Sequence, residues 1–128
     1  MWWREVDVAA PADDAWELLV DTERWSDWGP TVTAVRLDHA GHELRADSTG
    51  AVRTPLGFWL PFAVEEWQES PDRAWSWRVA GLAATTHVVE ETAPDRCRVR
   101  FGVPGWAPAY LAVVEVGLRR VRTLAQDG

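Results

Sequence analysis

The first thirty residues carry two hydrophobic patterns in succession. Val6 and Val8 flank Asp7 with the period of two that is typical of a half-buried strand. Pro11 then stands where the first residue of a helix tolerates a missing N–H, and an apolar face with helical spacing follows it. The pattern predicts a short strand and then an amphipathic helix over 11–20. The apolar face of this helix consists of Ala15, Trp16, Leu19 and Val20.

A second short helix is predicted directly after the first. Asp21 is suited to cap its N-terminus, and Trp25 and Trp28 are three residues apart, so they share one face. Gly29 and Pro30 end it. Two short helices in a row therefore interrupt the sheet after its first strand.

The middle of the chain has strand-like alternation separated by turn signals. Strands are expected over 31–38, 43–53, 58–69, 75–79, 84–92 and 97–103, with turns at 39–42, 54–57, 70–73 and 93–96. Pro61 suggests an edge position or a bulge. Turns this short favour antiparallel pairing, because a parallel neighbour needs a crossover of about a dozen residues or more.

From Trp106 onward the hydrophobic period changes to three or four residues, which predicts a closing helix of roughly twenty residues. Glu115 and Arg119 are spaced to pair on its solvent side. An antiparallel sheet with one apolar face needs cover, and this helix has an apolar stripe of matching length. The predicted fold is α+β, with the long helix lying across the sheet.

Three stretches carry a resemblance to a known superfamily: A-P-A-D-D-A-W-E-L-L-V-D-T-E-R-W-S-D-W, the later P-F-A-V-E-E-W-Q-E-S-P-D-R-A-W-S-W-R-V, and the helix after Trp106. Together they resemble the START-like, or SRPBCC, superfamily of polyketide cyclases and dehydrases, plant allergens and lipid-transfer domains. The resemblance spans essentially the whole chain. It implies a single START-like domain over 1–128 with a helix-grip fold, and a cavity between the last helix and the sheet that the short helices close at one mouth.

Length and charge narrow the function classes. A chain of 128 residues is the usual size of one domain. The formal net charge of −7 opposes attraction to nucleic acid or anionic lipid, so neither is expected as a partner. No apolar run is long enough for a membrane span, and no signal-peptide pattern is visible. The lone Cys97 excludes an internal disulfide, and a cytoplasmic location is expected.

All basic residues are Arg, and Lys, Ile and Asn are absent. Codons for these three residues are rich in A and T, so their absence indicates a GC-rich, bacterial genome. The arginine content is therefore weak evidence for function.

Ten tryptophans in a chain of this length suit a pocket for an aromatic or otherwise apolar ligand, because indole rings bury much area and carry one polar group. The competing interpretation is that they fill the core. The predicted ligand-binding residues are Trp25, Trp28, Trp59, Phe62, Trp77, His87 and Tyr110.

Three polar side chains are the candidates for catalysis. His87 shares a strand face with Thr85 and titrates near neutral pH, but a structural histidine is the alternative. Arg100 alternates with an apolar pair, so it is solvated if that pair packs under the helix. Tyr110 begins the last helix, where its hydroxyl either faces the cavity or packs at the sheet end.

Other catalytic and metal-binding patterns are missing from the sequence. His39 and His42 form H-x-x-H, but in a turn with neither Cys nor a third His nearby, so no metal site is predicted. No G-x-S-x-G, phosphate-binding glycine loop or H-E-x-x-H occurs. No cofactor is expected.

Two functions are compatible with these features, and a third is held in reserve. The favoured one is binding or carriage of a small hydrophobic or aromatic molecule in the cavity. The alternative is an aromatase, cyclase or dehydratase like those in the polyketide branch, with His87, Arg100 and Tyr110 as its polar groups. The reserve is a regulatory module that binds a protein partner, or a homodimer, through exposed tryptophans such as Trp2, Trp3 and Trp67.

Overall fold

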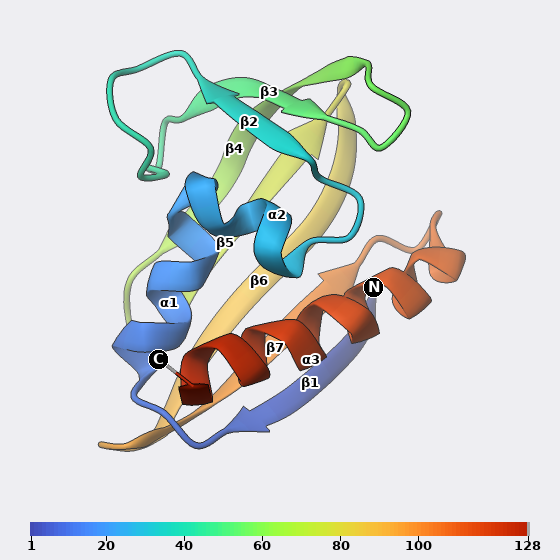
Figure 1. Cartoon of the computed structure of the whole chain (residues 1–128). Coiled ribbons are helices and arrows are strands. Elements are labelled where there is room, and N and C mark those ends of the chain that lie inside the picture. Colours follow the sequence, from blue (N-terminus) through green and yellow to red (C-terminus); the bar gives the residue numbers. More distant parts are fainter. Residues whose placement is uncertain (128) are drawn as a thin grey trace.

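The computed structural model describes residues 1–127, and Figure 1 shows a long C-terminal helix lying along one face of a curved sheet. The elements follow one another as β1 (Trp2–Val8), α1 (Ala12–Val20), the 3₁₀ turn η1 (Thr22–Arg24), α2 (Trp25–Trp28), β2 (Ala34–Leu37), β3 (Thr49–Arg53), β4 (Trp59–Gln68), β5 (Arg73–Val79), β6 (Leu82–Ala93), β7 (Arg96–Val103), η2 (Pro108–Tyr110) and α3 (Leu111–Asp127). This is the helix-grip architecture that the sequence predicts. Within residues 1–127, no helix is long and apolar enough to cross a membrane.

The seven strands form one antiparallel sheet in the order β1-β7-β6-β5-β4-β3-β2. The face toward the helices is called the inner face below, and the opposite one the outer face. α3 packs against β1 and β7 and contacts α1 and α2. Its Glu115 accepts from Arg4 of β1, with 2.9 Å between Arg4 Nε and Glu115 Oε1. The predicted partner Arg119 is therefore not the one that Glu115 contacts.

Strand alternation places the core where the sequence expects it. In β7, Val99, Phe101 and Val103 are buried on the inner face, while Arg100 points to the outer face. α3 contributes a buried stripe that matches them. Its members are Val114, Gly117, Leu118, Val121 and Ala125.

The connection between β2 and β3 differs from the prediction. The sequence suggests a tight turn followed by a strand over 43–53, but β3 forms only at Thr49–Arg53. The residues before it fasten α1 instead. The Leu44 side chain is buried in the core, and its N–H donates to the carbonyl of Val20 at the end of α1, at 2.8 Å.

A β-bulge changes the facing of β4. Its register against β5 shifts between Val64 and Glu66, rather than at Pro61 where the sequence suggests an irregularity. The extra residue turns Trp67 back to the inner face. There Trp67 packs edge-on against Trp16 of α1, with ring centroids 5.5 Å apart. The reserve hypothesis required Trp67 to belong to an exposed tryptophan patch, and the structure places it elsewhere.

The backbones of β2 and β3 approach each other closely at Gly50. A Cβ added to Gly50 would clash with the backbone oxygen of Arg36 on β2. We expect Gly50→Ala to lower the free energy of unfolding by about 2–4 kcal/mol, because two backbones would have to separate. Gly105→Ala is the control, since an added Cβ there meets open space, and we expect a change within about 0.5 kcal/mol. Urea denaturation measures both, and equal stabilities would contradict the prediction.

Candidate ligand-binding site

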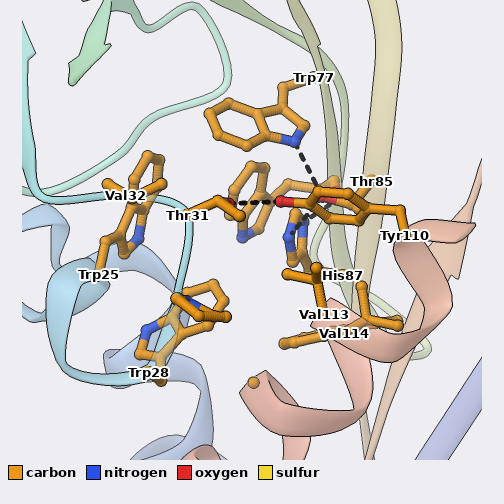
Figure 2. Close-up of a pocket in the computed structure, with 15 residues that line it drawn as sticks. Trp25, Trp28, Thr31, Val32, Trp77, Thr85, His87, Tyr110, Val113 and Val114 are labelled. Carbon is orange, nitrogen blue, oxygen red and sulfur yellow. Dashed lines mark hydrogen bonds between the residues drawn. The ribbon is translucent and has the colours of Figure 1, made fainter. Parts of the chain in front are cut away.

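Two adjoining cavities lie against the inner face of the sheet, between the short helices and the start of α3. The inner cavity has a volume of about 40 Å³ and the outer one about 250 Å³. They adjoin because five residues line both of them, and Figure 2 labels these five among its lining side chains. The shared residues are Thr31, Val32, Trp77, Thr85 and Tyr110.

Stacked rings form the wall of the inner cavity. Trp75 lies between two partners: its ring is 5.4 Å from that of Trp25 with planes 9° apart, and 3.9 Å from the His87 imidazole with planes 22° apart. Phe101 and Trp28 meet the same imidazole edge-on, at 5.0 and 6.1 Å. The stack links a short helix directly to the sheet.

The end of α1 explains why Trp25 and Trp28 point inward. The last carbonyls of a helix have no partner within it. Trp25 Nε1 donates to the carbonyl of Leu19 at 2.9 Å, and Trp28 Nε1 donates to that of Leu18 at 2.8 Å. Each indole therefore satisfies a helix terminus while its ring enters the cavity wall.

The outer cavity has mostly apolar walls. They come from β3 to β7 and from the connection between β7 and α3. The apolar lining consists of Val32, Val52, Leu60, Trp77, Val79, Ala84, Val103, Pro104, Trp106 and Ala107. Such a lining binds apolar surface through the hydrophobic effect, and the few hydroxyl groups in it fix orientation.

A chain of hydrogen bonds crosses the junction of the two cavities (Figure 2). Trp77 Nε1 donates to Thr85 Oγ1 at 3.0 Å. Because a carbonyl can only accept, His87 Nδ1 carries the proton of the neutral imidazole and faces the carbonyl of Trp75 at 3.4 Å. His87 Nε2 then accepts from the Thr85 hydroxyl at 3.1 Å. Both imidazole nitrogens are engaged.

Burial lowers the pKa of His87 to about 3, against the weaker opposing effect of the Trp75 carbonyl. The imidazole is therefore neutral near pH 7. The neutral ring packs into the aromatic wall of the inner cavity.

A hydroxyl pair joins the two sides of the junction. Thr31, in the loop between α2 and β2, and Tyr110, at the end of η2, have their oxygens 2.5 Å apart. Burial raises the pKa of Tyr110, and the Thr31 hydroxyl partly offsets this. The phenol is neutral and able to share its proton with a ligand oxygen.

Two buried polar atoms beside the cavities lack a partner within residues 1–127. Trp75 Nε1 belongs to a residue of the inner lining, and Thr54 Oγ1 to a residue of the outer lining. Buried donors and hydroxyls are normally paired with protein, water or a ligand. Both atoms can therefore accept or donate a further hydrogen bond to water or to a ligand according to their chemistry.

Five of the seven predicted ligand-binding residues line the cavities. These are Trp25, Trp28, Trp77, His87 and Tyr110. Phe62 is buried one layer behind, with its ring 6.0 Å from Trp25 and 5.4 Å from Trp77. Trp59 lines neither cavity, and the guanidinium of Arg36 lies 4.1 Å from its ring.

The catalytic candidates do not converge. His87 and Tyr110 line the inner cavity, whereas Arg100 is on the outer face, with its guanidinium 4.8 Å from the Trp3 ring. The reason is the strand period: Arg100 alternates with residues that face α3. It therefore contributes nothing to the cavity.

Sequence reasoning missed Thr31, Thr54, Trp75 and Thr85 as lining residues. Two of them had a usable signal, because Trp75 shares a predicted strand face with Trp77, and Thr85 shares one with His87. Thr54 had none, since turn residues carry no periodicity. Thr31 falls in the strand predicted over 31–38, but β2 begins only at Ala34, so Thr31 lies in the loop before it.

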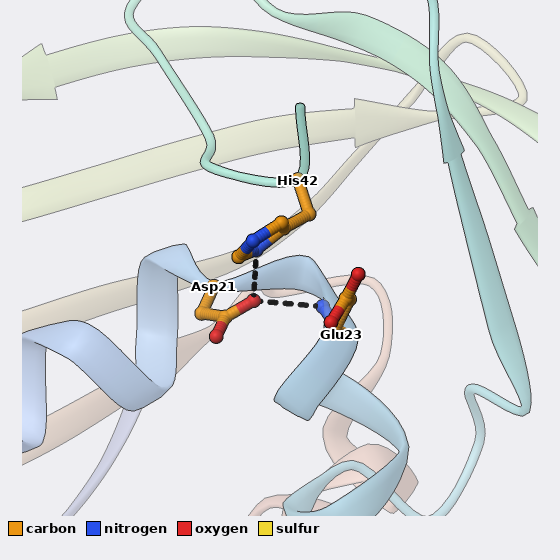
Figure 3. Close-up of side chains that lie close together, drawn as sticks. All are labelled: Asp21, Glu23 and His42. Carbon is orange, nitrogen blue, oxygen red and sulfur yellow. Dashed lines mark hydrogen bonds and ion pairs between the residues drawn. The ribbon is translucent and has the colours of Figure 1, made fainter. Parts of the chain in front are cut away.

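A second cluster of titratable side chains lies at the junction of α1 and η1, away from the cavities. Figure 3 shows the side chains of Asp21, Glu23 and His42 close together. Their nitrogen and oxygen atoms that could bind a metal lie within 4.8 Å of one another. His42 Nδ1 donates to Asp21 Oδ1 at 2.6 Å, and that oxygen also accepts from the Glu23 N–H at 3.1 Å. His39, the other member of H-x-x-H, faces Ser48 Oγ at 2.8 Å instead. Within this cluster, the contacts of the Asp21 carboxylate are thus hydrogen bonds from the His42 imidazole and the Glu23 backbone amide.

Comparison with known proteins identifies the class. The sequence profile of the family described as "Polyketide cyclase / dehydrase and lipid transport" matches residues 4–126, so the chain belongs to this family. It lies within the SRPBCC superfamily that the sequence resembles. A search of the curated proteins finds no match.

Solved structures share the fold at low identity. A hypothetical protein of Helicobacter pylori superposes with a TM-score of 0.77 at 16% identity, covering 96% of this chain and 86% of its own. Truncated norcoclaurine synthase from Thalictrum flavum gives 0.66 at 14% identity, with coverage of 99% and 93%. The Zhui aromatase/cyclase from Streptomyces sp. R1128 gives 0.65 at 19%, with coverage of 97% and 92%. Family and fold together define a polyketide cyclase/dehydrase-like domain that binds hydrophobic ligands.

The buried neutral His87 predicts a pH dependence of stability. The unfolded chain takes up a proton at His87 below about pH 6.5, while the folded protein does so only near pH 3. Stability is therefore lost as the pH falls through this window, by at most about 1.4 kcal/mol per pH unit from this residue. Urea denaturation of the wild type and of His87→Gln at several pH values measures the difference. Parallel profiles would contradict the prediction.

The exposed His42 is expected to titrate in the opposite direction. Its bond to Asp21 raises the pKa of His42, so the pair stabilises the loop at low pH and loses this effect as the pH rises through the raised pKa. We expect Asp21→Asn to lower the pKa of His42 in an NMR titration. Asp47 lies in the β2–β3 connection, like His42, but makes no contact with the His42 imidazole. Asp47→Asn should therefore leave the pKa of His42 unchanged, and an equal effect of both variants would refute the pairing.

Proposed function

We propose that this protein binds and carries a small, flat aromatic molecule, with residues 1–128 acting as one domain. The observation that carries the proposal is the pair of adjoining cavities, which combine a stacked aromatic wall with an apolar outer chamber. Concave, mostly apolar sites with a few polar groups are typical of small-molecule binding.

Cavity volume supports a compact ligand. The outer cavity, at about 250 Å³, is slightly below the roughly 300–1,000 Å³ of sites that hold drug-sized molecules. The inner cavity, at about 40 Å³, holds a small polar substituent or a few water molecules. A skeleton of a few fused rings in the outer chamber, with a polar group directed inward, fits both volumes.

The unpaired polar atoms favour a ligand with at least one oxygen. Trp75 Nε1 is a donor without an acceptor, and Thr54 Oγ1 is an unpaired hydroxyl. A phenol or a ring carbonyl would accept from the first and exchange a hydrogen bond with the second. Leaving such groups unpaired disfavours a pure hydrocarbon.

Carriage is favoured over catalysis by the state of the polar groups. His87 is neutral, with both nitrogens hydrogen-bonded, and Arg100 faces away from the cavities. The thiol of Cys97 is buried, and Cys97 is in neither cavity lining. General acid–base chemistry needs a group that can both reach the ligand and change its protonation state.

A cyclase or dehydratase is the second candidate, and the Thr31–Tyr110 pair favours it. These hydroxyls lie where the cavities meet, so Tyr110 can protonate the hydroxyl that leaves the ligand as water, while a water molecule takes the proton from the neighbouring carbon and solvent returns a proton to the phenolate. One neighbour of the same fold is an aromatase/cyclase. Conversion of a bound poly-β-ketone probe, abolished by Tyr110→Phe, would support this candidate over carriage.

The binding proposal is tested by titrating the protein with 1-naphthol and with naphthalene. Quenching of tryptophan fluorescence reports binding of each probe. We expect saturable 1-naphthol binding, and a weaker affinity for naphthalene by about fivefold because it makes no hydrogen bond. Ala84→Phe fills the outer cavity and should weaken 1-naphthol binding by roughly tenfold or more. Ala83→Phe, one residue away and exposed, should have little effect.

Tyr110→Phe provides a further comparison. It removes one hydroxyl at the junction of the cavities, so the affinity for 1-naphthol should move closer to the affinity for naphthalene. Absence of saturable binding by either probe, or equal behaviour of the Ala83 and Ala84 variants, would contradict binding in this cavity. Native mass spectrometry of protein purified from its own host would identify a ligand that remains bound.

A further inference from the structure

Large apolar side chains are exposed around the mouth of the outer cavity. They come from three different connections between strands and helices, and together they are called the rim below. The rim consists of Leu56 (84% exposed), Phe58 (52%), Leu82 (58%) and Trp106 (63%).

Each rim residue adjoins the cavity lining. Leu56 and Phe58 lie in the β3–β4 turn, between the lining residues Thr54 and Leu60. Leu82 begins β6 and pairs with the lining residue Val79.

Trp106 closes the arrangement from the third connection. It lines the outer cavity itself, and its Nε1 donates to the carbonyl of Ala83 at 3.1 Å, which joins the β7–α3 connection to the start of β6. In Figure 1 these connections lie toward the right of the molecule. The rim residues thus all adjoin the lining of the same cavity.

The segments that build the mouth contain no acidic residue of their own. The segments 28–37, 48–64, 74–89 and 99–114 build the mouth and its surroundings, and none of the 20 carboxylates of the chain lies in them. Their charged residues are arginines. Arg78 pairs with Glu65 at 2.9 Å, whereas Arg36 and Arg53 contact no carboxylate within residues 1–127.

The distribution of charge changes what the net charge implies. Counted over the whole chain, −7 predicts repulsion from anionic lipid. The carboxylates are all outside the mouth segments. A negatively charged surface would therefore orient the protein so that the rim faces that surface. Arginines beside exposed apolar side chains suit the boundary between headgroups and acyl chains.

We propose that the rim docks on the surface of a phospholipid bilayer that contains anionic headgroups, with Leu56, Phe58, Leu82 and Trp106 inserted among them. Arg53 and Arg36 then lie near the headgroup phosphates. The inserted mouth opens the outer cavity toward the membrane, so an apolar ligand enters without crossing water. This use of the docked state rests on the proposed carriage function, whereas the docking itself rests on the exposed side chains and the charges.

Vesicle sedimentation tests the docking. The full chain is mixed with vesicles of phosphatidylcholine, with or without phosphatidylglycerol, and the bound fraction is measured. We expect binding that is stronger with phosphatidylglycerol and weakened on the order of tenfold or more by Leu56→Asp combined with Leu82→Asp. Ala46→Asp combined with Thr123→Asp adds the same two charges at exposed positions outside the rim, and should leave binding within about twofold of the wild type.

Arg53→Gln separates the two contributions, because it should weaken binding to the phosphatidylglycerol vesicles and leave binding to phosphatidylcholine unchanged. Leu56→Cys labelled with an environment-sensitive dye reports insertion as a blue shift, and the buried Cys97 does not compete for the label. A label that stays in water while the protein is bound would overturn insertion of the rim.

Other results would also overturn the proposal. These are a wild type that binds neither kind of vesicle, and an aspartate double variant that binds as well as the wild type. Concentration-dependent dimerisation abolished by the same double variant, without vesicle binding, would assign the rim to a second copy instead. Binding of 1-naphthol in vesicle-free buffer is measured in parallel, so loss of ligand binding and loss of docking are distinguished.

Discussion

The inner face of the sheet is wider than one helix can cover, and this constraint shapes the rest of the structure. An apolar sheet face must be shielded from water. α3 packs on β1 and β7, and α1 lies over β6 and β7 and reaches β4 through the contact of Trp16 with Trp67, which leaves much of the face of β5, β4 and β3 to other cover. Side chains carried by the very short α2 cover part of it, through the stack of Trp25, Trp75 and His87. The part that no side chain fills is the pair of cavities.

The same constraint determines the chemistry of the cavity wall. His87 is drawn into an aromatic environment where a charged ring is unfavourable, so its nitrogens are satisfied locally by Thr85 and the Trp75 carbonyl. Tyr110 and Thr31 satisfy each other in a similar way. Polar groups are thus present, and most are paired within the protein, whereas Trp75 Nε1 has no partner within residues 1–127.

Charge and hydrophobicity are arranged on a larger scale around the chamber. The carboxylates that give the chain its net charge lie outside the segments that build the mouth, where large apolar side chains meet solvent. The carboxylates and the exposed apolar side chains of the rim thus lie on different parts of this small protein. The family has cyclases, dehydrases and lipid transport in its description, and a chamber with an apolar rim is consistent with carriage within that range.

The sequence by itself determined the order of elements, the antiparallel sheet, the long closing helix and the inward facing of Trp25, Trp28, Trp77 and His87. These features follow from local periodicity, which fixes facing as long as the strand or helix is uninterrupted. Only the tertiary structure decided the facing of Trp67, which a bulge reverses, and the irregular connection before β3, where Leu44 satisfies the end of α1. It also decided the position of Trp59 outside the cavity and the meeting of Thr31 with Tyr110. Contacts between distant segments depend on how packed elements approach one another, and no local pattern records that.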